Sequence, residues 1–162
     1  MFQSRIRFPR RLPEPALLAG ARERAQAPEG VAPPPGERSL AGHDAARRFF
    51  ANCFHGADPR RETLFVAYVD RAARCIHQSR PDGDEGGIHW PLRTILLEAA
   101  RNNCAGLLIA HNHPSGECTP SPSDLAATRR LASTADAIDV TLVDHLIFAG
   151  PDCASFRRLG YL

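Results

Sequence analysis

The stretch AGLLIAHNHPSGECTPSPSD, residues 105–124, decides the fold of this 162-residue chain. Its first six residues are small or apolar, which is typical of a buried central strand. The prolines and the glycine that follow turn the chain, and the hydroxyl side chains near its end favour the start of a helix. We therefore predict a strand over 105–110, a tight turn, and a helix over 123–135 that begins close to the end of the strand.

The segments around this stretch alternate between strand-like and helix-like patterns. Apolar runs predict further strands at 64–69 and 140–148. After a turn at 70–74, residues 75–78 are expected to form a short partner strand, and residues 81–87 a flexible loop. Helical spacing of apolar residues predicts helices at 40–55 and 91–103, the second beginning with Pro91 at its first position. This alternation predicts an α/β or α+β domain in which helices cover a small sheet, with the C-terminal residues 155–162 packing back on it.

The chain divides into three parts by composition. Residues 1–38 are rich in proline and arginine and contain few large apolar side chains, so we expect a disordered tail. Residues 39–58 form an N-terminal helical segment, which ends before Asp58-Pro59 breaks the helix. Residues 59–162 form the compact domain.

Composition excludes several classes of protein. The formal charge is only +2, which does not require a nucleic-acid partner. The five cysteines are widely spaced without a C-x-x-C pair, so we expect reduced thiols rather than a disulfide framework. No apolar run reaches the ~18 residues of a membrane span, and the Arg-rich N-terminus lacks the apolar core of a secretory signal. A cytoplasmic protein without a membrane partner is the expectation.

The turn after the central strand contains a candidate metal site. His111 and His113 point to the same side of an extended chain, and Asp124 falls in the first turn of the next helix, from which its carboxylate can return toward both imidazoles. Two histidines and one carboxylate are a common catalytic set for Zn²⁺, which leaves the fourth tetrahedral position open. The alternative for Asp124 is an acid that stabilises the start of the helix, and both roles are compatible.

Hydrolysis at such a site also needs a proton acceptor and a donor to the developing oxyanion. Ser121 has the right chemistry to donate that hydrogen bond, although a helix-capping hydroxyl is its alternative role. The residue types alone leave four carboxylates open as the base: Glu62, Glu85, Glu98 and Glu117.

The spacing His-x-His, seven residues, Ser, two residues, Asp resembles the JAMM motif of MPN/JAB-domain metalloproteases. The wider strings HNHPSG, TPSPSD, TRRL, VDHLIF and the ending SFRRLGYL are similar to the RadC-like family. This resemblance covers about residues 60–162. It implies a three-layer, cytidine-deaminase-like domain with a mixed sheet flanked by helices.

The resemblance also assigns roles to the candidate residues. It implies that His111, His113 and Asp124 bind Zn²⁺, that Glu62 just before the first strand is the general base, and that Ser121 assists the oxyanion. The implied function is a zinc-dependent peptidase or isopeptidase acting on a peptide or protein. The alternative is a non-catalytic or DNA-repair-associated accessory module, although residues 1–58 lack the helix-hairpin-helix pattern of many relatives.

Several nearby residues allow two interpretations. Asp144 and His145 either form a hydrogen-bonded pair that fixes the sheet or orient a ligand imidazole. Cys118 is a free thiol or, in the less favoured interpretation, an extra ligand, and Trp90 is a core anchor or a substrate platform. The adjacent letters His-Asn-His do not indicate an HNH nuclease, whose residues are spread over a ββα unit.

Overall fold

The computed structural model describes residues 39–81 and 90–162. Within them the elements follow in the order α1 (His43–Phe54), β1 (Leu64–Val69), β2 (Cys75–Ser79), α2 (Leu92–Arg101), β3 (Gly106–Asn112), α3 (Pro122–Asp136), β4 (Thr141–Ala149) and β5 (Asp152–Ser155). None of the described helices is long and apolar enough to cross a bilayer.

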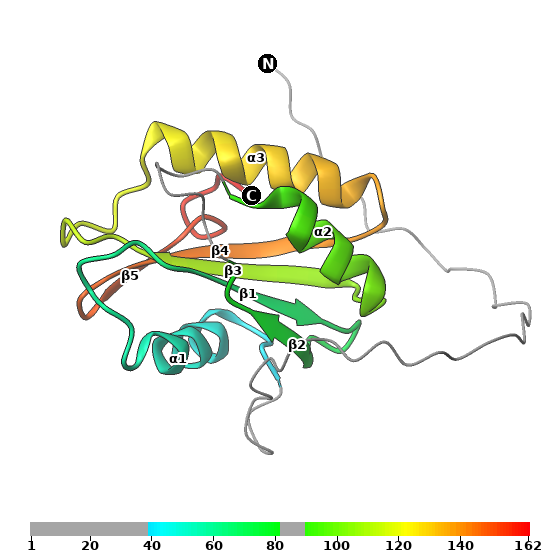
Figure 1. Ribbon diagram of the computed structural model, residues 1–162, viewed down its shortest axis with the longest axis horizontal. Coiled ribbons are helices and arrows are strands. Elements are labelled where there is room, and N and C mark those ends of the chain that lie inside the picture. The colour runs from blue at the N-terminus through cyan, green and yellow to red at the C-terminus, as the bar shows by residue number, and fades with distance from the viewer. Residues whose placement is uncertain (1–38, 82–89) are drawn as a thin grey trace, which may run out of the picture.

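The five strands form one mixed sheet in the order β2-β1-β3-β4-β5. β3 and β4 are parallel and are joined through α3, whereas the other neighbouring strands are antiparallel. Helix α1 lies on one face of the sheet, and α2 and α3 lie on the other (Figure 1). The predicted α+β domain with helices on a mixed sheet is therefore confirmed.

The alternation of side chains along the central strands builds a core on each face. Leu108 and Ala110 of β3 pack in the cluster that contains the α1 residues Phe49 and Phe50. Leu107 and Ile109 pack in the second cluster, which includes residues of α2 and α3. Because side chains alternate with period two, the next residue of the second set is position 111, on the face covered by α2 and α3.

A bulge in β4 shifts its register against β3. Leu107 pairs with Leu142, but Leu108 pairs with Asp144, so Val143 is the extra residue. Leu142 belongs to the cluster on the α2–α3 face, whereas Leu146 belongs to the cluster on the α1 face. Without the bulge both would share a face. The bulge therefore reverses the alternation, and it turns His145 rather than Asp144 toward the face of α2 and α3.

Gly106 at the start of β3 allows this bulge to pack closely. A Cβ atom there would lie 2.8 Å from Val143 Cγ2 and 3.2 Å from both Thr141 O and Val69 Cγ2. We predict that Gly106→Ala lowers the free energy of unfolding by about 1–3 kcal/mol, the usual cost of overpacking a core. Urea denaturation of both proteins measures this, and equal midpoints would show that the strands adjust without cost.

The element boundaries differ from the sequence-based expectations by up to three residues, and the largest difference is at the start of α1, predicted at residue 40 and observed at His43. β3 continues to Asn112, two residues beyond the predicted end, because the polar residues at its end still pair with β4. The short strand β5 was not predicted, and only its pairing with β4 defines it. The expected packing of the C-terminal segment is present, since Phe156 is fully buried. The predicted tail over 1–38 and residues 82–87 of the predicted loop lie outside the described residues.

Candidate metal centre

The two histidines of the turn lie at the end of β3 and face each other. Their Nε2 atoms are 2.8 Å apart, and His111 is only 1 % exposed. His113 Nδ1 lies 2.8 Å from the carbonyl oxygen of Glu117. Because a carbonyl only accepts hydrogen bonds, His113 carries a proton on Nδ1, and its Nε2 is the nitrogen that faces His111.

Asp124 reaches the same point from the first turn of α3. Its backbone N–H is capped by the Ser121 hydroxyl, and its Oδ2 accepts from the Ser121 backbone N–H at 2.8 Å, which completes a capping box. Oδ2 also lies 3.3 Å from His113 Nε2, and Oδ1 lies 3.4 Å from His111 Nε2. The carboxylate of Asp124 can therefore cap the helix and face both imidazoles at the same time.

The carboxylate of Asp124 is fully buried, and its Oδ1 has no hydrogen-bond partner in the described part of the chain. Burial alone would raise the pKa of this group, but the contacts with His111 and Ser121 outweigh burial and hold the pKa well below its usual range. An ionised, buried oxygen without a donor is costly unless a cation or another donor satisfies it.

Glu62 approaches from the segment that precedes β1. Its Oε1 lies 3.6 Å from His111 Nε2, and its side chain is 32 % exposed, so it stands at the rim of the group. Asn112 fixes this segment to β3, because its amide accepts from Thr63 N at 2.7 Å and donates to Arg61 O at 2.9 Å. The middle residue of His-Asn-His therefore positions the backbone on either side of Glu62, a role that the sequence analysis missed.

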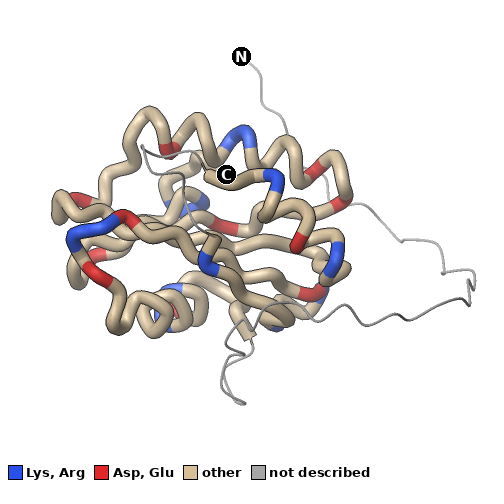
Figure 2. Tube along the Cα trace, in the orientation of Figure 1, with Lys and Arg blue, Asp and Glu red and all other residues tan. Residues whose placement is uncertain are grey.

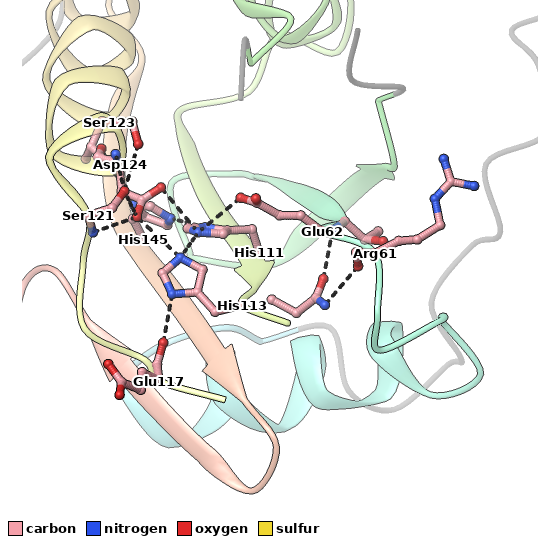
Figure 3. A network of polar contacts seen from close by, with 12 residues as sticks. Arg61, Glu62, His111, His113, Glu117, Ser121, Ser123, Asp124 and His145 are labelled. Carbon is pink, nitrogen blue, oxygen red and sulfur yellow. Dashed lines mark hydrogen bonds and ion pairs between the residues drawn. The ribbon is translucent and has the colours of Figure 1, made fainter. Parts of the chain in front are cut away.

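The ligand atoms of Glu62, His111, His113 and Asp124 all lie within 4.8 Å of one another (Figure 3). Bonds of about 2.0–2.2 Å to a tetrahedral zinc ion require ligand atoms about 3.3–3.5 Å apart. The carboxylate–imidazole distances of 3.4 and 3.3 Å match this separation, and the imidazole pair is somewhat closer. Nitrogen and carboxylate donors of this kind, with one unsatisfied buried oxygen, fit a zinc ion.

Comparison with known proteins places this arrangement in a family. The model of the RadC-like JAB domain matches residues 41–161, which is most of the chain. The chain belongs to the RadC-like JAB domain family. The resemblance predicted from the motif is thus confirmed, and the match also includes the region of α1.

The curated relatives extend beyond the part that the chain matches. A UPF0758 protein of Cupriavidus pinatubonensis is 50% identical over 70 residues, which cover 43% of this chain and 31% of that protein. UPF0758 proteins from two strains of Actinobacillus pleuropneumoniae are 38% identical over 102 residues, or 60% of this chain and 45% of each relative. The match thus spans less than half the length of these proteins.

Within this RadC-like JAB domain, the candidate bases separate clearly. Glu62 is the one whose carboxylate joins the group. Glu98, in α2, instead accepts a hydrogen bond from the Tyr68 hydroxyl. Glu117 contributes its carbonyl oxygen, and its carboxylate points away from the histidines in Figure 3. Glu85 lies outside the described residues.

Asp144 and His145, for which the sequence allowed two interpretations, have different roles. Asp144 bonds to the backbone N–H of His145 and Arg157 and to the Ser155 hydroxyl, so it fixes β5 and the C-terminal segment. His145 is fully buried, and its Nε2 lies 2.8 Å from His111 Nδ1. Burial lowers the pKa of His145 well below its usual value. Asp144 is therefore structural, whereas His145 contacts a candidate ligand.

Two further predicted residues lie near the group without joining it. The Trp90 ring packs edge-on against His145, with centroids 4.9 Å apart, and is half-buried against the core under α2 and α3. This placement fits a core anchor that also covers the imidazoles. Cys118 is a half-buried free thiol and is not part of the four-residue group.

Proposed function

We propose that this domain is a zinc-dependent hydrolase of the JAMM type that cleaves an amide bond in a peptide or protein. The observation that carries the proposal is the buried carboxylate of Asp124. Its two oxygens lie 3.4 and 3.3 Å from the Nε2 atoms of His111 and His113, and its Oδ1 has no hydrogen-bond partner among the described residues. A structural hydrogen-bond network would satisfy this oxygen, whereas a cation between the three side chains satisfies all of them. His111, His113 and Asp124 would hold that zinc ion.

When bound, a zinc ion of this kind polarises the substrate carbonyl and lowers the pKa of a water to about 7. Glu62 is then the group that takes the proton from the water and passes it to the leaving amine. Two features support this role: its carboxylate reaches within 3.6 Å of His111 Nε2, and it retains contact with solvent. A general base must come within hydrogen-bond reach of the water from which it takes the proton.

Ser121 supports the same reaction as a hydrogen-bond donor to the oxyanion. Its hydroxyl lies 2.6 Å from Asp124 Oδ2. Asp124 Oδ2 also accepts from the backbone N–H of Ser121. The hydroxyl can therefore turn toward a substrate while this oxygen keeps a hydrogen-bond donor. We propose that the residue caps α3 and donates to the developing negative charge.

Two substitutions of Ser121 separate these roles. Ser121→Ala is expected to cost about 1 kcal/mol of stability through the lost cap, whereas Ser121→Gly costs only a few tenths. Both remove the hydroxyl, so both should lower kcat by about 10²-fold if it serves the oxyanion. Thermal unfolding and turnover are measured on the same samples, and near-normal turnover of the glycine variant would limit the residue to capping.

The experiment that tests the function combines zinc content with cleavage. The full chain is stripped with a chelator, reloaded with one equivalent of zinc and incubated with a peptide library and with isopeptide-linked conjugates, followed by mass spectrometry. We expect one zinc per chain and products that appear only in the reloaded sample. A protein that takes up no zinc would contradict the proposal.

The alternative of a DNA-associated module has weaker support. Figure 2 shows arginine and acidic positions interspersed along the described trace, and the formal charge of the whole chain is +2. Phosphate contacts give binding that falls steeply with salt. Tight, salt-dependent binding of duplex or single-stranded DNA would favour the alternative over the hydrolase.

A further inference from the structure

A chain of buried hydrogen bonds runs from the start of α3 to the ligand His111. Thr128 Oγ1 lies 2.6 Å from Asp124 O and 2.8 Å from His145 Nδ1, and His145 Nε2 lies 2.8 Å from His111 Nδ1. All four residues are buried. The chain therefore joins the backbone of one candidate ligand to the side chain of another.

The direction of the hydrogen bonds follows from counting protons. Thr128 has one hydroxyl proton, and Asp124 O can only accept, so that proton is donated to the carbonyl. Thr128 Oγ1 must then accept from His145 Nδ1–H. With the ring neutral, as its complete burial favours, His145 Nε2 carries a lone pair and must accept from His111 Nδ1–H.

This order of protons decides which atom of His111 is free. With Nδ1 holding its proton, Nε2 is the ring nitrogen that can offer a lone pair to a metal, and this atom faces Asp124 Oδ1 and His113. In the reverse order His145 would donate to His111 Nδ1, and Nε2 would carry the proton and could not bind a metal. His113 has its proton fixed by a carbonyl, but His111 faces another imidazole, which can either donate or accept, so its tautomer needs the hydroxyl.

We infer that Thr128 and His145 are positioning residues that hold a proton on His111 Nδ1, so that Nε2 is the nitrogen that faces the metal position. The inference rests on the proposed function, because it concerns the same zinc site. Partners that orient a ligand imidazole typically change metal affinity by about 10–100-fold. Neither residue touches the proposed ion or substrate.

The direct test uses the metal-free full chain labelled with ¹⁵N. Long-range ¹H–¹⁵N spectra distinguish protonated from bare ring nitrogens of each histidine. We expect a proton on Nδ1 of both His111 and His145 before any zinc is added. A His111 Nδ1 without a proton would overturn the inference, whether or not the protein binds zinc.

Substitutions at Thr128 provide the second test. Thr128→Val keeps the shape but removes the hydroxyl, and it should weaken zinc binding by about 10–100-fold in competition with a chromogenic chelator. Thr128→Ser should restore both affinity and tautomer. Thr134→Val is the matched control, because Thr134 on the same helix makes the same type of bond to the carbonyl of Arg130 on the exposed side.

The outcomes separate the inference from the proposed function. Zinc binding by Thr128→Val as tight as that of the wild type, with an unchanged His111 tautomer, would overturn the inference and leave the zinc hydrolase intact. Absence of zinc binding in every variant, with the expected tautomers in the metal-free spectra, would overturn the proposed function but leave the proton order established. If Thr128→Val fails to fold, the spectra of the wild type still decide.

Discussion

Replacing Glu62 with glutamine is expected to lower the rate of hydrolysis by about 10²–10⁴-fold while one zinc ion still binds. The amide has nearly the same shape as the carboxylate but does not accept a proton, so the water is no longer activated. Its exposed position at the rim means that the substitution leaves the core untouched. We therefore expect unchanged thermal unfolding of the metal-free protein.

The measurement compares kcat and zinc content in the same preparations. Glu117→Gln is the matched control, because Glu117 lies near the same turn but offers only its backbone carbonyl to His113. It should retain full activity. Loss of zinc from Glu62→Gln would indicate that Glu62 is a ligand rather than the base, and full activity would remove it from the mechanism.

Zinc is expected to stabilise the folded domain strongly. A ligand that binds only the folded state at about 1,000 times its Kd adds about 4 kcal/mol to the free energy of unfolding. For a chain of this size, that corresponds to a rise of roughly 10 °C in Tm. The physical source of the expected effect is that a bound zinc ion would satisfy the buried Asp124 Oδ1, which has no hydrogen-bond partner among the described residues.

Asp124→Asn should abolish most of the zinc-dependent rise in Tm. The amide oxygen can still accept from Ser121, but the negative charge that draws the cation is gone. Asp136→Asn, an exposed position at the other end of α3, is the control and should respond to zinc like the wild type. Scanning calorimetry with and without zinc measures both, and an equal rise in all three proteins would place the metal elsewhere.

Local sequence patterns were sufficient to predict most of the fold. The apolar runs located β1, β3 and β4, and the helical spacing located α1 and α2, because each pattern reports burial on one face. The prolines and capping hydroxyls before residue 123 located α3. The spacing from His111 to Asp124 was enough to predict that the three side chains meet, since a strand, a rigid turn and a helix leave little freedom between them. Their roles in binding and catalysis remain predictions.

The supporting contacts of the site join distant segments, so the local patterns left two interpretations open for His145 and did not single out Thr128. The bulge at Val143 decides that His145 faces His111, and nothing in the local apolar pattern indicates an extra residue there. In the sequence Thr128 is an ordinary helix residue, and its contact with His145 is seen only when α3 packs on β4. The position of Asn112 did indicate a different role, because a residue between two ligands on a strand must face away from them.

The most direct test of the zinc site is a crystal structure of the zinc-loaded protein with anomalous data collected at the zinc edge. We predict one strong peak about 2.0–2.2 Å from His111 Nε2, His113 Nε2 and a carboxylate oxygen of Asp124, with Glu62 beside the open fourth position. A peak bound elsewhere, or no peak between these side chains in fully loaded protein, would contradict the account.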